Sequence, residues 1–268
     1  MSKPIGVFDS GVGGLTVVKE LLNSLPEEDI VYLGDTARVP YGNKSYQTVT
    51  RYSFEIGDFL ISKNIKILVV ACNTVSALSL NDIKGRYNIP VVGVIMPGVK
   101  KAIKSTSNFR IGIIGTEATI NSNSYYNAIK KLAPDSKIYS KACPLFVPLA
   151  EEGLLDDEIT FLTAKKYLKE MKEAQIDSLI LGCTHYPLLK KVIRKVMGKD
   201  VILVDSAKET AKEVEKILKD KGLKKTDKNY NNHEFFVTDF PERFKKVGKI
   251  FLGKSLNHVM KIDISYGH

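Results

Sequence analysis

The sequence contains few of the residues that build metal centres and disulfide-bonded scaffolds. Among 268 residues there are three cysteines and four histidines. Three cysteines cannot all pair in disulfides, and no C-x-x-C, H-E-x-x-H or mixed cysteine–histidine cluster typical of a zinc site occurs. We therefore expect free thiols, as in a reducing compartment, and no metal site.

Long apolar runs are also missing. No run approaches the roughly 20 apolar residues that a transmembrane helix needs. Met1-Ser2-Lys3-Pro4 leads directly into the strand-like Ile5–Phe8, without the apolar segment of a signal peptide. The sequence thus predicts a cytoplasmic protein that does not bind a membrane.

The charge balance is basic, with a formal net charge of +10 from 40 basic and 30 acidic residues. Such an excess invites a nucleic-acid-binding interpretation. However, the lysines between residues 190 and 228 are largely interleaved with acids, as in Lys208-Glu209, which is typical of solvated helix faces. No aromatic stacking platform accompanies them. We expect no nucleic-acid partner, although the positive charge can attract a small anionic substrate.

Apolar stretches of strand length alternate with stretches of helical apolar spacing, which favours an α/β fold with mostly parallel strands. The near-continuous hydrophobicity of the short stretches is typical of strands buried on both faces. Strands are expected at Ile5–Phe8, Ile30–Leu33, Ile67–Ala71, Val91–Val94, Ile111–Ile114, Lys137–Ser140, Leu179–Leu181 and Val201–Val204. Helices are expected at Leu15–Leu25, Tyr46–Lys63 and Ile159–Ala174.

Two of the three cysteines occur in matching sequence frames. Cys72 ends the segment Ile67–Cys72 and Cys183 ends the segment Ser178–Cys183. In each segment an apolar run and one small residue precede the cysteine, and short polar residues and a helix-like stretch follow it. Two thiols presented alike suggest an active site that needs one thiol on each side of a substrate.

The matching frames belong to a longer internal repeat. They are 111 residues apart, as are the next strands, which start at Pro90 and Val201. The opening strands at residues 5–10 and 111–116 are 106 residues apart. All α/β units share a general likeness, but several elements recurring in the same order favour duplication. We expect two pseudo-symmetric domains, each a mostly parallel sheet flanked by helices.

The boundaries of these domains are expected near residues 96–98 and 205–206. The tail from Ala207 onward contains a helix, a polar loop at residues 224–232, strand-like segments at Phe235–Val237 and Val259–Ile264, and a helix between them. This tail can return to the first domain. We therefore expect residues 1–96 plus 207–268 to form the domain with Cys72, and residues 97–206 the domain with Cys183. The active site is expected in the cleft between them.

The position of the two cysteines favours chemistry over packing. A lone buried cysteine is usually a small core residue, and we interpret Cys143 in this way. Cys72 and Cys183 instead lie at expected strand-to-helix junctions, where a helix N-terminus stabilises the thiolate and lowers the pKa of a free thiol from about 8.5. The residues that follow can donate hydrogen bonds to the thiolate or to a bound carboxylate; they are Asn73, Thr74, Thr184 and His185.

Two further loops follow expected strands. The segment Asp9–Thr16 is rich in glycine but is neither a Walker A loop nor the dinucleotide motif G-x-G-x-x-G. It is either an anion-binding loop or a tight turn in which Asp9 or Ser10 caps the helix. In the loop Gly34–Gly42, Tyr41 is either a binding residue or a packing residue.

Taken together, these motifs resemble those of the glutamate racemases, in the aspartate/glutamate racemase superfamily. The resemblance covers essentially the whole chain, through the segments Gly6–Thr16, Gly34–Gly42, Ala71–Thr74, Cys143–Leu149 with Glu151–Gly153, and Gly182–Leu189. It implies interconversion of L- and D-glutamate without a cofactor, which supplies D-glutamate for peptidoglycan. It also implies two α/β domains with the site between them, and a homodimer.

The resemblance also assigns roles to individual residues. Cys72 and Cys183 correspond to the catalytic acid/base pair, and Asp9, His185 and Glu151 correspond to residues that assist them. Residues that correspond to substrate binders are Asp9, Ser10, Tyr41, Gly42, Asn73, Thr74, Thr116, Thr184 and His185.

Three other functions are consistent with parts of the pattern. A racemase of aspartate or a related substrate would use the same pair of thiols. A cysteine-dependent amide hydrolase would need one thiol, a base and an oxyanion hole, and gives no reason for the second matched cysteine. A two-domain binding protein would bind a dicarboxylate without exchanging its α-proton. Assays of proton exchange on glutamate and aspartate distinguish these functions.

Overall fold

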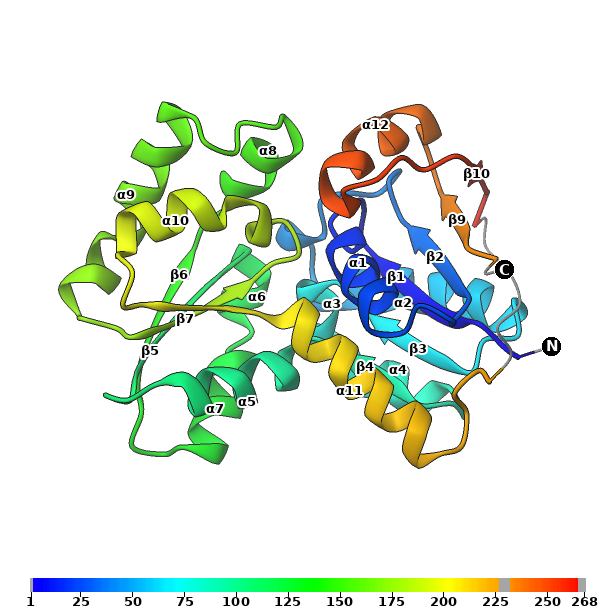
Figure 1. Cartoon of the computed structure of the whole chain (residues 1–268), viewed down its shortest axis with the longest axis horizontal. Helices are drawn as coiled ribbons and strands as arrows, with labels where there is room; N and C mark the ends of the chain where they lie inside the picture. Colours follow the sequence, from blue (N-terminus) through cyan, green and yellow to red (C-terminus); the bar gives the residue numbers. More distant parts are fainter. Residues whose placement is uncertain (1, 227–231, 265–268) are drawn as a thin grey trace.

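In the computed structural model, two parallel β-sheets lie next to each other and helices flank both (Figure 1). The structure describes residues 2–226 and 232–264. The first sheet has the order β10-β9-β2-β1-β3-β4, with β1 (Ile5–Asp9), β2 (Ile30–Gly34), β3 (Ile67–Val70), β4 (Val91–Gly93), β9 (Glu234–Val237) and β10 (Val259–Lys261). The second has the order β6-β5-β7-β8, with β5 (Arg110–Gly115), β6 (Lys137–Ala142), β7 (Ser178–Gly182) and β8 (Ile202–Asp205).

Helices connect successive strands and cover both faces of each sheet. They are α1 (Leu15–Ser24), α2 (Tyr46–Ser62), α3 (Asn73–Leu78), α4 (Leu80–Arg86), α5 (Ile95–Ser105), α6 (Glu117–Asn121), α7 (Ser124–Leu132), α8 (Phe146–Glu151), α9 (Glu158–Glu173), α10 (Lys190–Met197), α11 (Ser206–Asp220) and α12 (Pro241–Leu252). Two 3₁₀ turns, η1 (Tyr41–Asn43) and η2 (Tyr186–Leu189), complete the list.

The internal repeat is visible in the strand order. The run β2-β1-β3-β4 in the first sheet has the same order as β6-β5-β7-β8 in the second, and every strand pair is parallel. Cys72 follows the third strand of its half and Cys183 follows the third strand of the other. The predicted α/β fold class with two pseudo-symmetric sheets is confirmed.

The strands are apolar throughout because each is buried on both faces. In β3, Ile67 and Val69 join the core under α1, α11 and α12, whereas Leu68 and Val70 join the core under α2, α3 and α4. Alternate residues thus contribute to two different cores. This arrangement removes the period-2 alternation from the sequence and leaves continuous apolar runs.

The C-terminal tail returns to the first sheet, as expected. Helix α11 runs from the second sheet toward the first (Figure 1), β9 pairs with β2, and β10 pairs with β9. The predicted strand Val259–Ile264 is shorter in the structure and ends at Lys261, which pairs with the last residue of β9, Val237. The predicted polar loop at residues 224–232 lies partly outside the described residues.

A buried ion pair holds the return of the tail in place. Lys66 Nζ lies 2.6 Å from Glu28 Oε2, and their side chains are 3% and 1% exposed. Lys66 also donates to the carbonyl of Leu223, and Glu28 accepts from the backbone N–H of Lys225. One ion pair thus joins the segments before β2, before β3 and after α11.

We expect Lys66→Ala to lower the free energy of unfolding by about 3 kcal/mol, because it leaves the Glu28 carboxylate buried without a countercharge. Urea denaturation of the purified protein measures this change. Lys63→Ala is the matched control, since Lys63 lies 3.7 Å from Glu234 in a pair whose side chains are each 33% exposed. Pairs of that kind contribute only about 0–1 kcal/mol. Equal effects of the two substitutions would contradict the role given to the buried pair.

Candidate active site

The carboxyl ends of the strands in both halves face one cavity of about 520 Å³. Open parallel sheets bind ligands at this edge. Every site residue predicted from the sequence, except Asp9, lines the cavity. These residues are Ser10, Tyr41, Gly42, Cys72, Asn73, Thr74, Thr116, Glu151, Cys183, Thr184 and His185.

Cys72 occupies the junction between β3 and α3 and is 5% exposed. Its Sγ donates to the hydroxyl of Ser10 at 3.6 Å. Burial raises the pKa of Cys72 to about 12 and the nearby Asp9 carboxylate adds to this, while the backbone N–H of Val75 opposes it. The expected lowering of this pKa is wrong, because the start of a six-residue helix does not offset full burial. At neutral pH this residue is a thiol.

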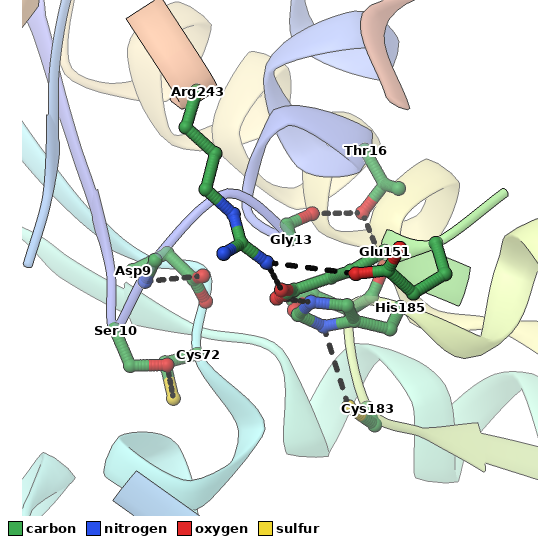
Figure 2. A network of polar contacts seen from close by, with 12 residues as sticks. Asp9, Ser10, Gly13, Thr16, Cys72, Glu151, Cys183, His185 and Arg243 are labelled. Carbon is green, nitrogen blue, oxygen red and sulfur yellow. Dashed lines mark hydrogen bonds and ion pairs between the residues drawn. The ribbon is translucent and has the colours of Figure 1, made fainter. Parts of the chain in front are cut away.

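Cys183 has a different environment, although it is 6% exposed and follows the equivalent strand. The segment after it forms the 3₁₀ turn η2 rather than an α-helix. Its Sγ lies 3.8 Å from His185 Nδ1, and His185 Nε2 lies 3.0 Å from Glu151 Oε1 (Figure 2). Sulfur, imidazole and carboxylate thus form a continuous chain, which Cys72 lacks.

The imidazole in this chain is positively charged at neutral pH. Burial alone would lower the pKa of His185, but hydrogen bonds to Cys183 and Glu151, together with their charges, outweigh burial and raise it to about 10. The hydrogen bond from His185 also lowers the pKa of Glu151. The Nδ1 of this cation lies next to the sulfur of Cys183. The two halves therefore present one protonated thiol and one thiol beside a cation.

The charge on His185 predicts a pH dependence of folding stability. Its folded pKa of about 10 exceeds its ordinary value of 6.5, so its contribution is complete below pH 6.5 and is lost as the pH rises through 10. We expect the free energy of unfolding to decrease over this window in the wild type, and to decrease less in His185→Asn. Urea denaturation at a series of pH values measures the difference. Parallel curves for the two proteins would contradict the assignment.

Asp9 is fully buried and does not line the cavity. Its Oδ2 accepts the backbone N–H of Gly11 at 3.0 Å, whereas Oδ1 has no hydrogen-bond partner among the described residues. Burial raises the pKa of Asp9, against the charge of His185. The carboxylate shapes the glycine-rich turn instead of capping α1, which starts after Gly14 without a side-chain cap. Asp9 thus lies behind the cavity and interacts electrostatically with both Cys72 and His185.

Hydroxyl and amide groups from both halves meet on the other side of the cavity. The hydroxyls of Thr74 and Thr116 are 3.0 Å apart. The Asn73 Oδ1 accepts from the Tyr125 hydroxyl at 2.6 Å, so the amide NH₂ of Asn73 is left to donate to a ligand. These groups can satisfy a carboxylate without a formal positive charge, and no lysine or arginine belongs to the lining that the described residues form.

The η1 turn places a tyrosine and a glycine at the cavity wall. Tyr41 is both a lining and a packing residue, since it is 1% exposed, donates to Asp35 and packs against the ring of Tyr52. A Cβ on Gly42 would lie 2.7 Å from Cβ of Thr116, so only glycine fits at this contact between the halves. Tyr41 is thus a packing residue, one of the two alternatives, and its position in the cavity wall leaves the binding alternative as a prediction.

Other lining residues were not found from the sequence. Among them are Val39, Asn43, Glu117, Val147 and Pro148. Arg243 of α12 was also missed; it lies 3.7 Å from Glu151. It belongs to no motif, and only the return of the tail brings it to the site. Cys143 is fully buried in the core of the second half, as predicted.

Within residues 2–226 and 232–264, no cluster of three or more histidine, cysteine or acidic side chains could hold a metal ion. In the same part of the chain, none of the helices has the length and apolar content needed to cross a membrane.

Comparisons with known proteins agree with one another. The model of the family described as Asp/Glu/Hydantoin racemase matches residues 5–214. A glutamate racemase from Geobacter metallireducens is 54% identical over 262 residues, which cover 98% of this chain and 97% of that protein. The crystal structure of a glutamate racemase isoform from Bacillus anthracis superposes with a TM-score of 0.94 at 43% identity and covers 97% of both chains. That of the Francisella tularensis glutamate racemase in complex with D-glutamate gives 0.93 at 42% identity and covers 98% of both. The chain belongs to the Asp/Glu/Hydantoin racemase family and, within it, to the glutamate racemases.

Proposed function

We propose that the protein interconverts L- and D-glutamate by a two-thiol mechanism that needs no cofactor. The observation that carries this proposal is that Cys72 and Cys183, at equivalent positions of the two halves, line one cavity. Racemisation removes the α-proton from one face and delivers a proton to the other. A site with one thiol contributed by each half meets this requirement.

In each direction of the reaction one thiol is the base and the other is the acid. In one direction Cys183 is the thiolate base that accepts the α-proton and Cys72 is the thiol that donates a proton to the opposite face. In the other direction the roles are exchanged. Charge that develops on the α-carbon delocalises onto the substrate carboxylate, where the fixed donors of Asn73, Thr74 and Thr116 stabilise it.

The assisting residues differ between the halves. His185, held by Glu151, stabilises Cys183 when it is a thiolate. Burial, together with the nearby Asp9 carboxylate, raises the pKa of Cys72 and keeps it protonated. The remaining proposed substrate binders are Ser10, Tyr41, Gly42 and Thr184, which line the same cavity.

The substrate proposed is glutamate because the relatives are glutamate racemases over nearly their whole length. Neutral donors of the cavity, such as Asn73 and Thr74, can bind a carboxylate, and the net charge of +10 can attract the anion to it. A hydrolase built on Cys183, His185 and Glu151 would have a nucleophile, a base and an orienting carboxylate. Such a hydrolase mechanism assigns no role to Cys72.

Incubation of the purified protein in D₂O with each enantiomer tests the proposal. We expect L- and D-glutamate to be converted to the racemate, with deuterium at Cα and without added pyridoxal phosphate. Aspartate is expected to react far more slowly. A faster reaction with aspartate would assign the protein to that substrate. Hydrolysis of amides, or binding of glutamate without deuterium uptake, would overturn the proposal.

We also propose the remaining features that the family resemblance implies. The first domain comprises residues 1–96 plus 207–268, and the second comprises residues 97–206. The chain passes from the first domain to the second in α5 and returns at the start of α11. The enzyme is a cytoplasmic homodimer that supplies D-glutamate for peptidoglycan. Sedimentation equilibrium measures the oligomeric state, and growth of a D-glutamate auxotroph carrying this protein tests the cellular role.

A further inference from the structure

The glycine-rich loop of the first half contacts the histidine of the second half. A Cβ built on Gly13 would lie 2.6 Å from both Cε1 and Nδ1 of His185 and 2.2 Å from Oγ1 of Thr184. Real Cβ atoms do not approach heavy atoms this closely. Gly13 thus leaves space for the imidazole where any other residue would displace it. The sequence of this loop was interpreted as either an anion-binding loop or a tight turn. Its contact with the histidine is a further reason for glycine at position 13.

The imidazole cannot move away from such a side chain without a change in its other contacts. His185 is 7% exposed, and the ring of Phe251 in α12 packs edge-on against it at 5.1 Å between centroids. Its two nitrogens are engaged by Cys183 and Glu151. The ring therefore has neighbours on several sides, and a displacement from Gly13 must change its geometry to the sulfur or to the carboxylate.

A second residue of the same loop region holds the backbone next to His185. The hydroxyl of Thr16 lies 3.2 Å from the carbonyl oxygen of Thr184 and 2.9 Å from that of Gly13 (Figure 2). Thr16 is 7% exposed and belongs to α1 in the first half. The hydroxyl therefore links the Gly13 loop to the peptide that precedes His185.

We propose that Gly13 and Thr16 are positioning residues that set the orientation of His185, so that the first half of the protein controls the reactivity of the thiol on the second. This inference rests on the proposed function. The charged or titratable groups that face or adjoin the imidazole are Cys183 after β7, Glu151 of α8, Asp9 at the end of β1 and, through Glu151, Arg243 of α12.

The test is Gly13→Ala, with Gly85→Ala as the control because a Cβ on Gly85 meets nothing within 4 Å. We expect Gly13→Ala to lower kcat/KM for glutamate about 100-fold, the effect of roughly 1 Å of misplacement. The high-pH limb of the profile of kcat/KM should also move toward neutral pH, because an imidazolium that loses its partners loses its proton more readily. Gly85→Ala should leave both unchanged. An unshifted profile in Gly13→Ala would overturn the proposal.

A second pair of variants keeps the proposal testable if Gly13→Ala folds poorly. Thr16→Val removes the hydroxyl at nearly constant volume, whereas Thr16→Ser keeps it. We expect Thr16→Val to lower kcat/KM about 10-fold with the same shift of the high-pH limb, and Thr16→Ser to restore both. Equal activities and profiles for valine and serine would contradict a role of the hydroxyl.

Alkylation of the thiols separates failure of this inference from failure of the proposed function, since it needs no turnover. Iodoacetamide at pH 7 should modify Cys183 several-fold more slowly in Gly13→Ala than in the wild type, as mapped by mass spectrometry. Cys72 in the same sample is the internal control and should react at an unchanged rate. An unchanged rate at Cys183 overturns the positioning role, whereas a wild type that alkylates as expected but does not racemise glutamate overturns only the proposed function.

Discussion

Replacement of either active-site cysteine by alanine is expected to lower the rate of glutamate racemisation by about 10⁴-fold, the upper range for loss of a positioned acid or base. In the proposed mechanism each thiol serves one face of the α-carbon, and an alanine side chain can neither accept nor donate the proton there. Chiral chromatography of the products measures the loss for Cys72→Ala and Cys183→Ala.

The remaining thiol should still support half of the reaction. In Cys72→Ala, Cys183 can remove and return the α-proton of one enantiomer, which then acquires solvent deuterium without inversion. Cys183→Ala should exchange the opposite enantiomer. Exchange of the same enantiomer by both variants would show that the two thiols do not lie on opposite faces.

Cys143→Ala is the matched control. Cys143 is fully buried in the core of the second half and is not part of the cavity lining. We expect this variant to racemise glutamate within about two-fold of the wild type and to be less stable by about 1 kcal/mol, as for a small cavity in a core. A loss of activity comparable to that of the other two variants would mean that the cysteine assignments are wrong.

The second large effect is expected for His185→Asn, which should lower kcat/KM by about 10³-fold. Asparagine keeps hydrogen-bonding capacity but cannot carry the positive charge that His185 places next to Cys183. Glu151→Gln should have a smaller effect of about 10-fold, because it weakens the hold on the imidazole without removing it. Residues that act as one unit are not additive, so the double variant should resemble His185→Asn alone.

The two enantiomers constrain how this effect is measured. Because they have the same free energy, kcat/KM must fall equally in both directions in every variant. The different surroundings of Cys72 and Cys183 can therefore affect the two directions only through kcat and KM taken separately. These constants and the solvent isotope effect are measured for each direction. His258→Asn is the control, since His258 is exposed and is not part of the cavity lining. A His185→Asn variant with wild-type activity would contradict the cation assigned beside Cys183.

Local sequence patterns were sufficient for most of the fold. Continuous apolar runs such as Ile67–Ala71 predicted strands buried on both faces, and the spacing of the cysteine frames predicted the repeat that the strand order displays. The predicted end of the last strand was wrong because β10 stops where its partner β9 stops, at the pair Lys261 and Val237. The length of a strand depends on its neighbour, which its own residues do not encode.

The site was predictable only where its residues lie in recognisable motifs, most of which follow strands. Cys72 and Cys183 meet this condition, but their different environments depend on burial and on distant residues. The pKa of Cys72 is raised because burial outweighs the helix terminus, a quantity that the sequence does not contain. Arg243 reaches Glu151 only because the tail returns to the first sheet. The contact of Gly13 with His185 likewise joins segments that only the folded chain brings together.

The most direct test of the two-thiol account is the distribution of deuterium at early times in D₂O. The wild type is incubated with protonated L-glutamate, and the residual L-glutamate and the product D-glutamate are separated before the reaction approaches equilibrium. Two thiols on opposite faces predict that the product carries deuterium at Cα, delivered by an acid that has exchanged with solvent, while the residual substrate remains unlabelled. Product that retains the original proton would contradict the account, because a single base would then have moved that proton from one face to the other.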